Sequence, residues 1–131
     1  MKATALPIVL LVFRAYRELI HFDFLLAGRN FAALRDKVRK FPVKDRSPDP
    51  RTVQAICRAI DIACICYWKQ VLCLQRSAAT ACLLKRNGVP AVFVLGAQQL
   101  PFKAHAWVEV GGRVVNDKPY TAEIYGELDR C

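Results

Sequence analysis

The spacing of apolar residues changes once, about two-thirds of the way along this chain, and that change limits the possible folds more than any other feature. Before it, apolar side chains recur at steps of three and four, which is typical of amphipathic helices. After it, a β-branched and apolar run predicts a buried strand over about 89–96. Helices followed by strands indicate an α+β fold. The predicted helices cover about 7–27, 31–40, 51–67 and 73–86.

A pair of glycines, Gly111-Gly112, predicts a β-hairpin near the end of the chain. The pair separates two runs with strand character, about 104–110 and 113–117. Adjacent glycines are common in the tight turns of hairpins. We therefore expect a short antiparallel sheet, followed by a polar C-terminal tail.

A loop over 42–50, with three prolines and no apolar periodicity, is the one predicted internal boundary. It divides the chain into a helical N-terminal lead-in, 1–50, and a core, 51–131, which together should form one compact domain. The apolar run 3–13 is too short to span a bilayer, and no small-residue cleavage site follows it. We expect the first helix to remain on the protein, with no membrane span.

The net positive charge of the chain indicates which classes of partner it can bind. Twenty basic and 11 acidic residues give a net charge of +9. A basic surface favours anionic partners: an acidic peptide, a nucleic acid or a membrane face. The basic residues are scattered and do not alternate with aromatic ones, so we expect no nucleic-acid partner.

The cysteines indicate a reducing environment. Three of the six fall within one predicted helix, where free thiols behave as small apolar side chains. The chain is also longer than the small secreted domains that depend on disulfides. We predict a cytoplasmic protein with six reduced thiols. The absence of a C-x₂-C pair and of a G-x-x-x-x-G-K-[ST] sequence argues against a metal site and an ATP site, and no cofactor is expected.

A thiol, an imidazole and a carboxylate follow one another in an order that suits a cysteine hydrolase. Cys73 opens a predicted helix, whose unpaired N–H groups and dipole favour the thiolate. His105 lies on the first strand of the hairpin, and Asp117 ends the second. Such enzymes need a nucleophile, a His that deprotonates it and a group that orients the His. Each residue alone also has a structural explanation, and the second histidine, His21, lies mid-helix and receives no role.

The hairpin register decides whether these groups can meet. If the two glycines alone form the turn, Val110 pairs with Arg113. In that register, His105 and Asp117 point to opposite faces. If the residue before the glycines joins the loop, Glu109 pairs with Arg113 instead, and His105 lies opposite Asp117. Catalysis by all three groups requires the second register, which we predict, with the second glycine at positive φ.

Four stretches carry a resemblance to a known family: Cys73-Leu-Gln-Arg-Ser77, Leu83-Leu-Lys-Arg-Asn-Gly-Val-Pro90, Pro101-Phe-Lys-Ala-His-Ala-Trp-Val-Glu-Val110 and Val114-Val-Asn-Asp117. The chain resembles, over about 66–120, the transglutaminase-like leader peptidases of lasso-peptide biosynthesis, which are bacterial cysteine proteases. The resemblance implies a papain-related fold. It implies that Cys73 is the nucleophile, His105 the general base and then acid, and Asp117 the group that orients the His.

The resemblance also implies a reaction and partners. The reaction would remove the N-terminal leader from a ribosomally made precursor peptide. A separate leader-binding protein would deliver the precursor, and an ATP-using, asparagine-synthetase-like cyclase would then close the macrolactam ring. Two alternatives remain open: another acyl-transfer enzyme on the same site, such as a transglutaminase or amidase, and a non-catalytic peptide-binding module. The backbone N–H of Cys73 is one expected oxyanion donor, and Trp68 or Gln70 is the second.

Overall fold

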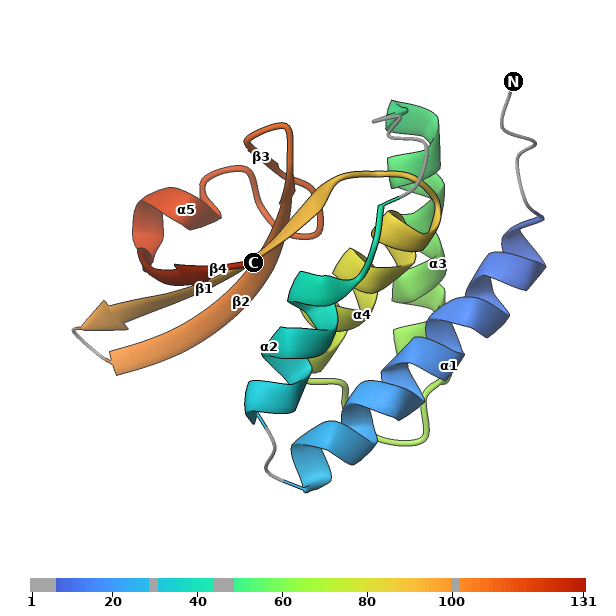
Figure 1. Cartoon of the computed structure of the whole chain (residues 1–131), viewed down its shortest axis with the longest axis horizontal. Coiled ribbons are helices and arrows are strands. Elements are labelled where there is room, and N and C mark those ends of the chain that lie inside the picture. Colours follow the sequence, from blue (N-terminus) through green and yellow to red (C-terminus); the bar gives the residue numbers. More distant parts are fainter. Residues whose placement is uncertain (1–6, 29–30, 44–48, 100–101) are drawn as a thin grey trace.

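A layer of helices packs against a curved antiparallel sheet in the computed structural model, which describes residues 7–28, 31–43, 49–99 and 102–131 (Figure 1). The helices are α1 (Ile8–Ala27), α2 (Phe31–Lys40), α3 (Pro50–Cys66), α4 (Cys73–Arg86) and the short α5 (Thr121–Ile124). The strands are β1 (Ala91–Gln99), β2 (Phe102–Val110), β3 (Arg113–Val114) and β4 (Gly126–Arg130), in the sheet order β3-β2-β1-β4. The predicted α+β class is confirmed.

Helix α4 lies at the centre of the fold, between α1 and α3 on one side and the sheet on the other (Figure 1). Ten of its 14 residues are buried. Small side chains at Ala78, Ala79 and Ala81 have no exposed surface, which allows close approach of the neighbouring elements. Gln75 adds a buried tie, because its Nε2 donates to the carbonyl of Leu19 in α1 at 2.7 Å. These contacts fix the helix that begins at Cys73.

The N-terminal helices join the same core. Leu19 and Phe22 of α1 are fully buried with Ile56 and Ile60 of α3, in one hydrophobic cluster that extends to the sheet. Helix α3 begins where its sequence predicts, since Asp49 accepts a hydrogen bond from the backbone N–H of Arg51. Over the residues that the structure describes, no helix is both long and apolar enough to cross a membrane. The division of the chain near residue 50 stays a prediction.

The hairpin differs from the predicted register. Val110 pairs with Arg113, and Glu109 pairs with Val114. The turn therefore consists of Gly111 and Gly112 alone, which have φ values of 60° and 80°. Positive φ at both positions is the signature of a tight two-residue turn, which matches the twist of the strands. The prediction of a three-residue loop was wrong, although the positive φ of the second glycine is confirmed.

Two further differences concern the end of the chain. The strand predicted over 113–117 ends at Val114, and the chain then turns away from β2. The polar tail forms β4, which pairs with β1 along the other edge of the sheet. A bulge interrupts that pairing between Leu95 and Gly96. Both changes affect the surroundings of His105, as described below.

Candidate active site

Cys73 is the first residue of α4 and is half-buried. The preceding residue, Leu72, cannot cap the helix with its side chain. No acidic side chain lies in the first turn. The thiol therefore lies at the N-terminal end of the helix with no carboxylate in that turn.

Cys73 and His105 line the same groove, which has a volume of about 400 Å³. It lies between the start of α4 and strands β1, β2 and β4, and its walls are almost entirely apolar. The remaining lining residues are Leu74, Leu95, Gly96, Ala104, Ala106 and Leu128. Among the hydrogen bonds of the described residues, none joins the sulfur to the imidazole, and such contacts often tighten only when substrate binds. The groove has room for a peptide side chain beside the thiol.

A larger cavity of about 660 Å³ lies between α3 and the β2–β3 turn. Val53, Val110 and Val115 contribute to its walls, but Cys73, His105 and Asp117 do not. Size alone therefore does not choose between the two, and the smaller groove is the candidate because Cys73 and His105 line it.

The imidazole of His105 contacts the carboxylate of Asp117 through Nε2 and Oδ2. Burial alone would raise the pKa of Asp117. Hydrogen bonds from His105 and from the backbone N–H of Lys118, with the nearby charge of Arg76, outweigh that effect and hold the pKa below its ordinary value. Asp117 therefore stays ionised at neutral pH. Because Nε2 is engaged, Nδ1 is the ring nitrogen left to serve a thiol.

Aromatic rings hold the imidazole in place. The rings of His105 and Tyr125 have centroids 5.1 Å apart, and Trp107 lies 6.2 Å from each of them. Gly96, directly opposite His105 on β1, makes this packing possible. A Cβ atom at Gly96 would lie 2.6 Å from the Trp107 ring and 3.0 Å from Tyr125. Sequence reasoning missed Tyr125, because the tail that carries it showed no strand pattern.

The side chain of Asn116, rather than the backbone register, allows Asp117 to reach His105. The N–H of Val115 still donates to the carbonyl of Val108 at 2.9 Å, as a continued ladder would require. The next ladder position is taken by a side chain, because Oδ1 of Asn116 accepts from the N–H of Val108 at 2.8 Å. The backbone leaves the sheet there, so strand alternation no longer fixes the direction of Asp117. This departure explains how the pair forms in the register that seemed to forbid it.

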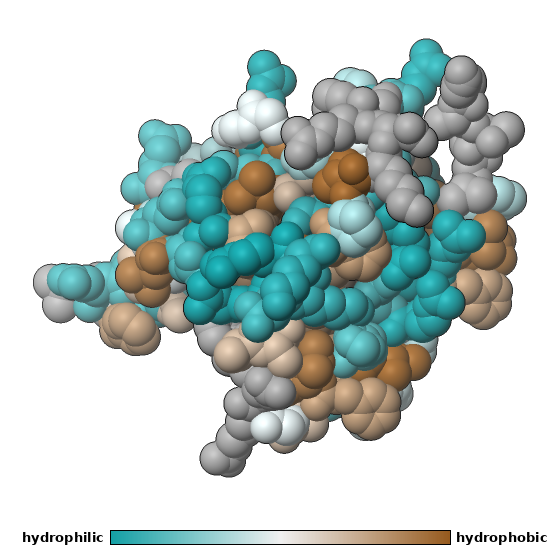
Figure 2. Space-filling model, in the orientation of Figure 1, coloured by the Kyte–Doolittle hydropathy of each residue, from teal (hydrophilic) through white to brown (hydrophobic). Residues whose placement is uncertain are grey.

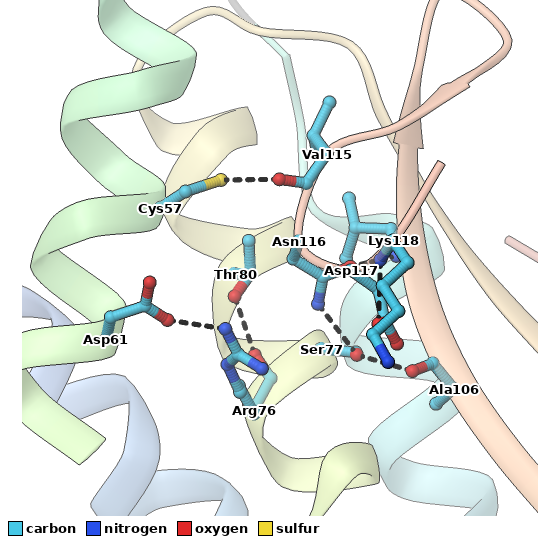
Figure 3. Close-up of polar contacts among 11 residues, drawn as sticks. Cys57, Asp61, Arg76, Ser77, Thr80, Ala106, Val115, Asn116, Asp117 and Lys118 are labelled. Atoms are coloured by element: carbon cyan, nitrogen blue, oxygen red, sulfur yellow. Dashed lines mark hydrogen bonds and ion pairs between the residues drawn. The ribbon is translucent and has the colours of Figure 1, made fainter. Parts of the chain in front are cut away.

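The same asparagine joins three parts of the site (Figure 3). Its Nδ2 donates to Oγ of Ser77 at 3.0 Å, and Ser77 donates to the carbonyl of Ala106 at 3.0 Å. Ser77 is 1% exposed and Asn116 8% exposed, so these bonds are shielded from water. Ser77 lies one turn after Cys73, Ala106 follows His105, and Asn116 precedes Asp117. Sequence reasoning assigned neither Ser77 nor Asn116 a role; their positions beside the candidate residues were the available signal.

Two buried cysteines differ from Cys73 in their surroundings. Burial raises the pKa of Cys57 to about 11 and that of Cys82 to about 12. Neither thiol is therefore ionised at neutral pH. All six cysteines are free, and no group of three or more His, Cys, Asp or Glu side chains among the described residues is placed to hold a metal ion.

The two candidate oxyanion donors lie in the segment between α3 and α4. Trp68 is 71% exposed, with its ring 5.8 Å from that of Tyr67, and Gln70 is also exposed. This segment enters α4 directly, so both side chains lie within a few residues of Cys73. The choice between them stays open.

Comparisons with known proteins show the family of the chain. The Transglutaminase-like superfamily matches residues 17–129, which is most of the chain. A stretch of 47 residues is 45% identical to McjB, the microcin J25-processing protein of Escherichia coli, and covers 36% of this chain and 23% of that protein. No solved structure matches the chain significantly. The family match extends from α1 to β4, and the chain belongs to the transglutaminase-like superfamily, as its sequence predicted.

Proposed function

We propose that this chain is a cysteine peptidase that removes the leader from a ribosomally made lasso-peptide precursor. The observation that carries the proposal is that the helix-terminal Cys73 and His105 line one groove, while His105 contacts the ionised Asp117. The family supports a cysteine-based acyl-transfer site, and the partial match to a microcin-processing protein supports a lasso-peptide precursor as substrate.

In the proposed reaction, the thiolate of Cys73 attacks the carbonyl carbon of the scissile peptide bond. His105 takes the thiol proton and then gives it to the departing amine, which leaves a thioester between Cys73 and the leader. Water deprotonated by His105 hydrolyses that thioester and regenerates the thiol. Asp117 orients the imidazole and stabilises its protonated form. The N–H of Cys73 and either Trp68 or Gln70 donate to the oxyanion.

The proposed setting is the bacterial cytoplasm. A separate leader-binding protein delivers the precursor, and an ATP-dependent, asparagine-synthetase-like cyclase consumes the freed core peptide. The peptidase itself uses no cofactor, metal or nucleic acid in this scheme.

The test uses a precursor peptide that is encoded beside the gene for this chain. The peptide is incubated with the purified chain, with and without the leader-binding protein encoded there. Mass spectrometry should find the leader and the core as separate products, with one water added in total. Cys73→Ala should yield neither product, whereas the matched control Cys66→Ala, at an exposed cysteine, should yield both. Uncleaved precursor under all conditions would refute the assignment.

A second acyl-transfer function is favoured by the superfamily itself. A transglutaminase would resolve the same thioester with an amine. Adding a primary amine to the reaction separates the two, because a transglutaminase would form the amide of the leader, while the proposed peptidase would still form its free carboxylate.

A further inference from the structure

Helix α1 is apolar on the face that points away from the core as well as on the face that is buried. Leu11, Leu19 and Phe22 face inward and are almost fully buried. Six other large apolar side chains of α1 remain exposed, and two of them, Ile8 and Leu10, lie in its first turn. The other four are exposed at 62%, 70%, 36% and 75% respectively: Val9, Phe13, Ile20 and Phe24. With 3.6 residues per turn, these four fall within a sector of about 60°. We call them the outer stripe.

The outer stripe continues onto a neighbouring segment at the C-terminal end of α1. Ile20 and Phe24 line a cavity of about 300 Å³ together with Tyr67, Trp68 and Lys69. The Trp68 ring is itself exposed, and the Lys69 ammonium lies 4.9 Å from its centroid. Figure 2 shows apolar side chains gathered along the right and lower edges of the molecule, where α1 runs in Figure 1. An exposed apolar patch of this size usually marks a surface that binds a partner or a membrane.

The charges on α1 favour an anionic neighbour. Arg14 and Arg17 lie on the helix beside the outer stripe. The first of the two carboxylates of α1, Glu18, is buried and accepts from Lys37 at 3.1 Å and Arg86 at 3.0 Å.

The second carboxylate of α1, Asp23, is also neutralised. It accepts from Tyr67 at 2.7 Å and pairs with Lys69 at 2.8 Å. Neither carboxylate of α1 is therefore left to balance Arg14 and Arg17, on a chain whose net charge is already +9.

We propose that α1 binds in the plane of an anionic lipid membrane, with the outer stripe inserted between the headgroups. A single convex helix with large apolar side chains along one line, an aromatic residue at one end and arginines beside the line has the chemistry of an interfacial helix. A second copy of this chain fits less well, because a two-fold axis across the stripe would bring like charges together at Arg17. The inference is independent of the proposed peptidase activity.

The position of α1 in the fold keeps the sheet side of the candidate active site away from the proposed membrane surface. In Figure 1, α1 forms the outer side of the helical layer, and the sheet that carries His105 lies on the opposite side of the molecule. A chain that lies on a bilayer through α1 therefore keeps the sheet with His105 away from the membrane, while Trp68 lies at the edge of the outer stripe.

Sedimentation with vesicles tests the proposal on the full chain. The probes are phosphatidylcholine vesicles with and without about 30% phosphatidylglycerol. The protein should sediment with the anionic vesicles, less so with neutral ones, and less as salt is added. The double variant Phe13→Ser/Phe24→Ser should bind at least about tenfold more weakly, because two large apolar side chains no longer insert.

Two control variants separate the stripe from general hydrophobicity and general charge. Phe102→Ser removes a phenylalanine of β2 with 72% exposure and should leave binding unchanged. Arg14→Gln/Arg17→Gln should reduce binding to anionic vesicles, whereas Arg51→Gln, on exposed α3 surface, should not. Circular dichroism and a thermal melt confirm that each variant is folded.

Three outcomes would overturn the inference. The first is that the protein does not sediment with anionic vesicles. The second is that the wild type and Phe13→Ser/Phe24→Ser bind vesicles equally. The third is that neither protein binds vesicles, while the wild type dimerises in analytical ultracentrifugation and the double variant does not. The last result would assign the outer stripe to a contact between copies of the chain.

Discussion

Replacement of Asn116 by alanine should damage both the stability and the activity of the protein, because this side chain holds the segment that carries Asp117. The change removes the acceptor for the N–H of Val108, a residue with no exposed surface, and the donor to Ser77. An unsatisfied buried donor costs about 1–3 kcal/mol, and loss of the second hydrogen bond about 0.5–1.5 kcal/mol. We therefore expect Asn116→Ala to lower the free energy of unfolding by about 2–4 kcal/mol.

Urea unfolding measures the stability of this variant, and steady-state cleavage of the precursor measures its activity. We expect kcat to fall with little change in KM, since in the proposed mechanism Asp117 acts on the imidazole and not on substrate binding. Asn87→Ala is the matched control: it removes one half-buried hydrogen bond, from Nδ2 to the carbonyl of Leu83 at 2.8 Å, at the far end of α4. That variant should lose about 1 kcal/mol of stability and keep its kcat. An Asn116→Ala protein with full activity and an unfolding free energy within about 0.5 kcal/mol of wild type would refute the reasoning.

Three further predictions concern the groove, the turn and the carboxylate. Gly96→Ala should destabilise the protein far more than Gly126→Ala in urea unfolding, because the new Cβ would meet the Trp107 ring at 2.6 Å whereas the nearest atom at Gly126 is 3.6 Å away; equal losses would contradict this. Gly112→Val should reduce stability and activity, and Gly112→Asn much less, because φ is 80° there; a fully active Gly112→Val enzyme would count against it. The depressed pKa of Asp117 adds stability that is complete above pH 3.8, its ordinary value, and is lost as the pH falls through the folded-state pKa. The urea midpoints of wild type and Asp117→Asn should therefore converge on acidification below pH 3.8, and a widening gap would argue otherwise.

Local patterns in the sequence predicted the helices and the presence of the hairpin. Helix α4 starts at Cys73 and ends at Arg86, as the spacing of its apolar residues and the following Asn-Gly pair indicated. The glycine pair likewise marked the turn. These features depend on neighbours within a few residues, so sequence alone contains the needed information.

Long-range hydrogen bonds account for what the sequence did not predict. The predicted hairpin register placed His105 opposite Asp117 through backbone pairing. In the structure, the side-chain oxygen of Asn116 accepts from the N–H of Val108 in place of a backbone carbonyl, and the chain leaves the sheet at that point. Strand β4 was missed because its residues, Gly-Glu-Leu-Asp-Arg, include only one apolar side chain, Leu128. Its pairing with β1 supplies the stability that its own composition lacks, and it follows Tyr125, which packs on the imidazole.

The central claim is that His105 and Asp117 activate Cys73, and the alkylation rate of that thiol tests it most directly. Iodoacetamide treatment at neutral pH, followed by mass spectrometry of the peptides, gives separate rates for Cys73 and for exposed Cys66 in the same molecule. We expect Cys73 in the wild type to react at least about tenfold faster than Cys66, and expect His105→Ala to remove that difference. Equal rates for the two thiols in the wild type, or a fast Cys73 in His105→Ala, would contradict the account.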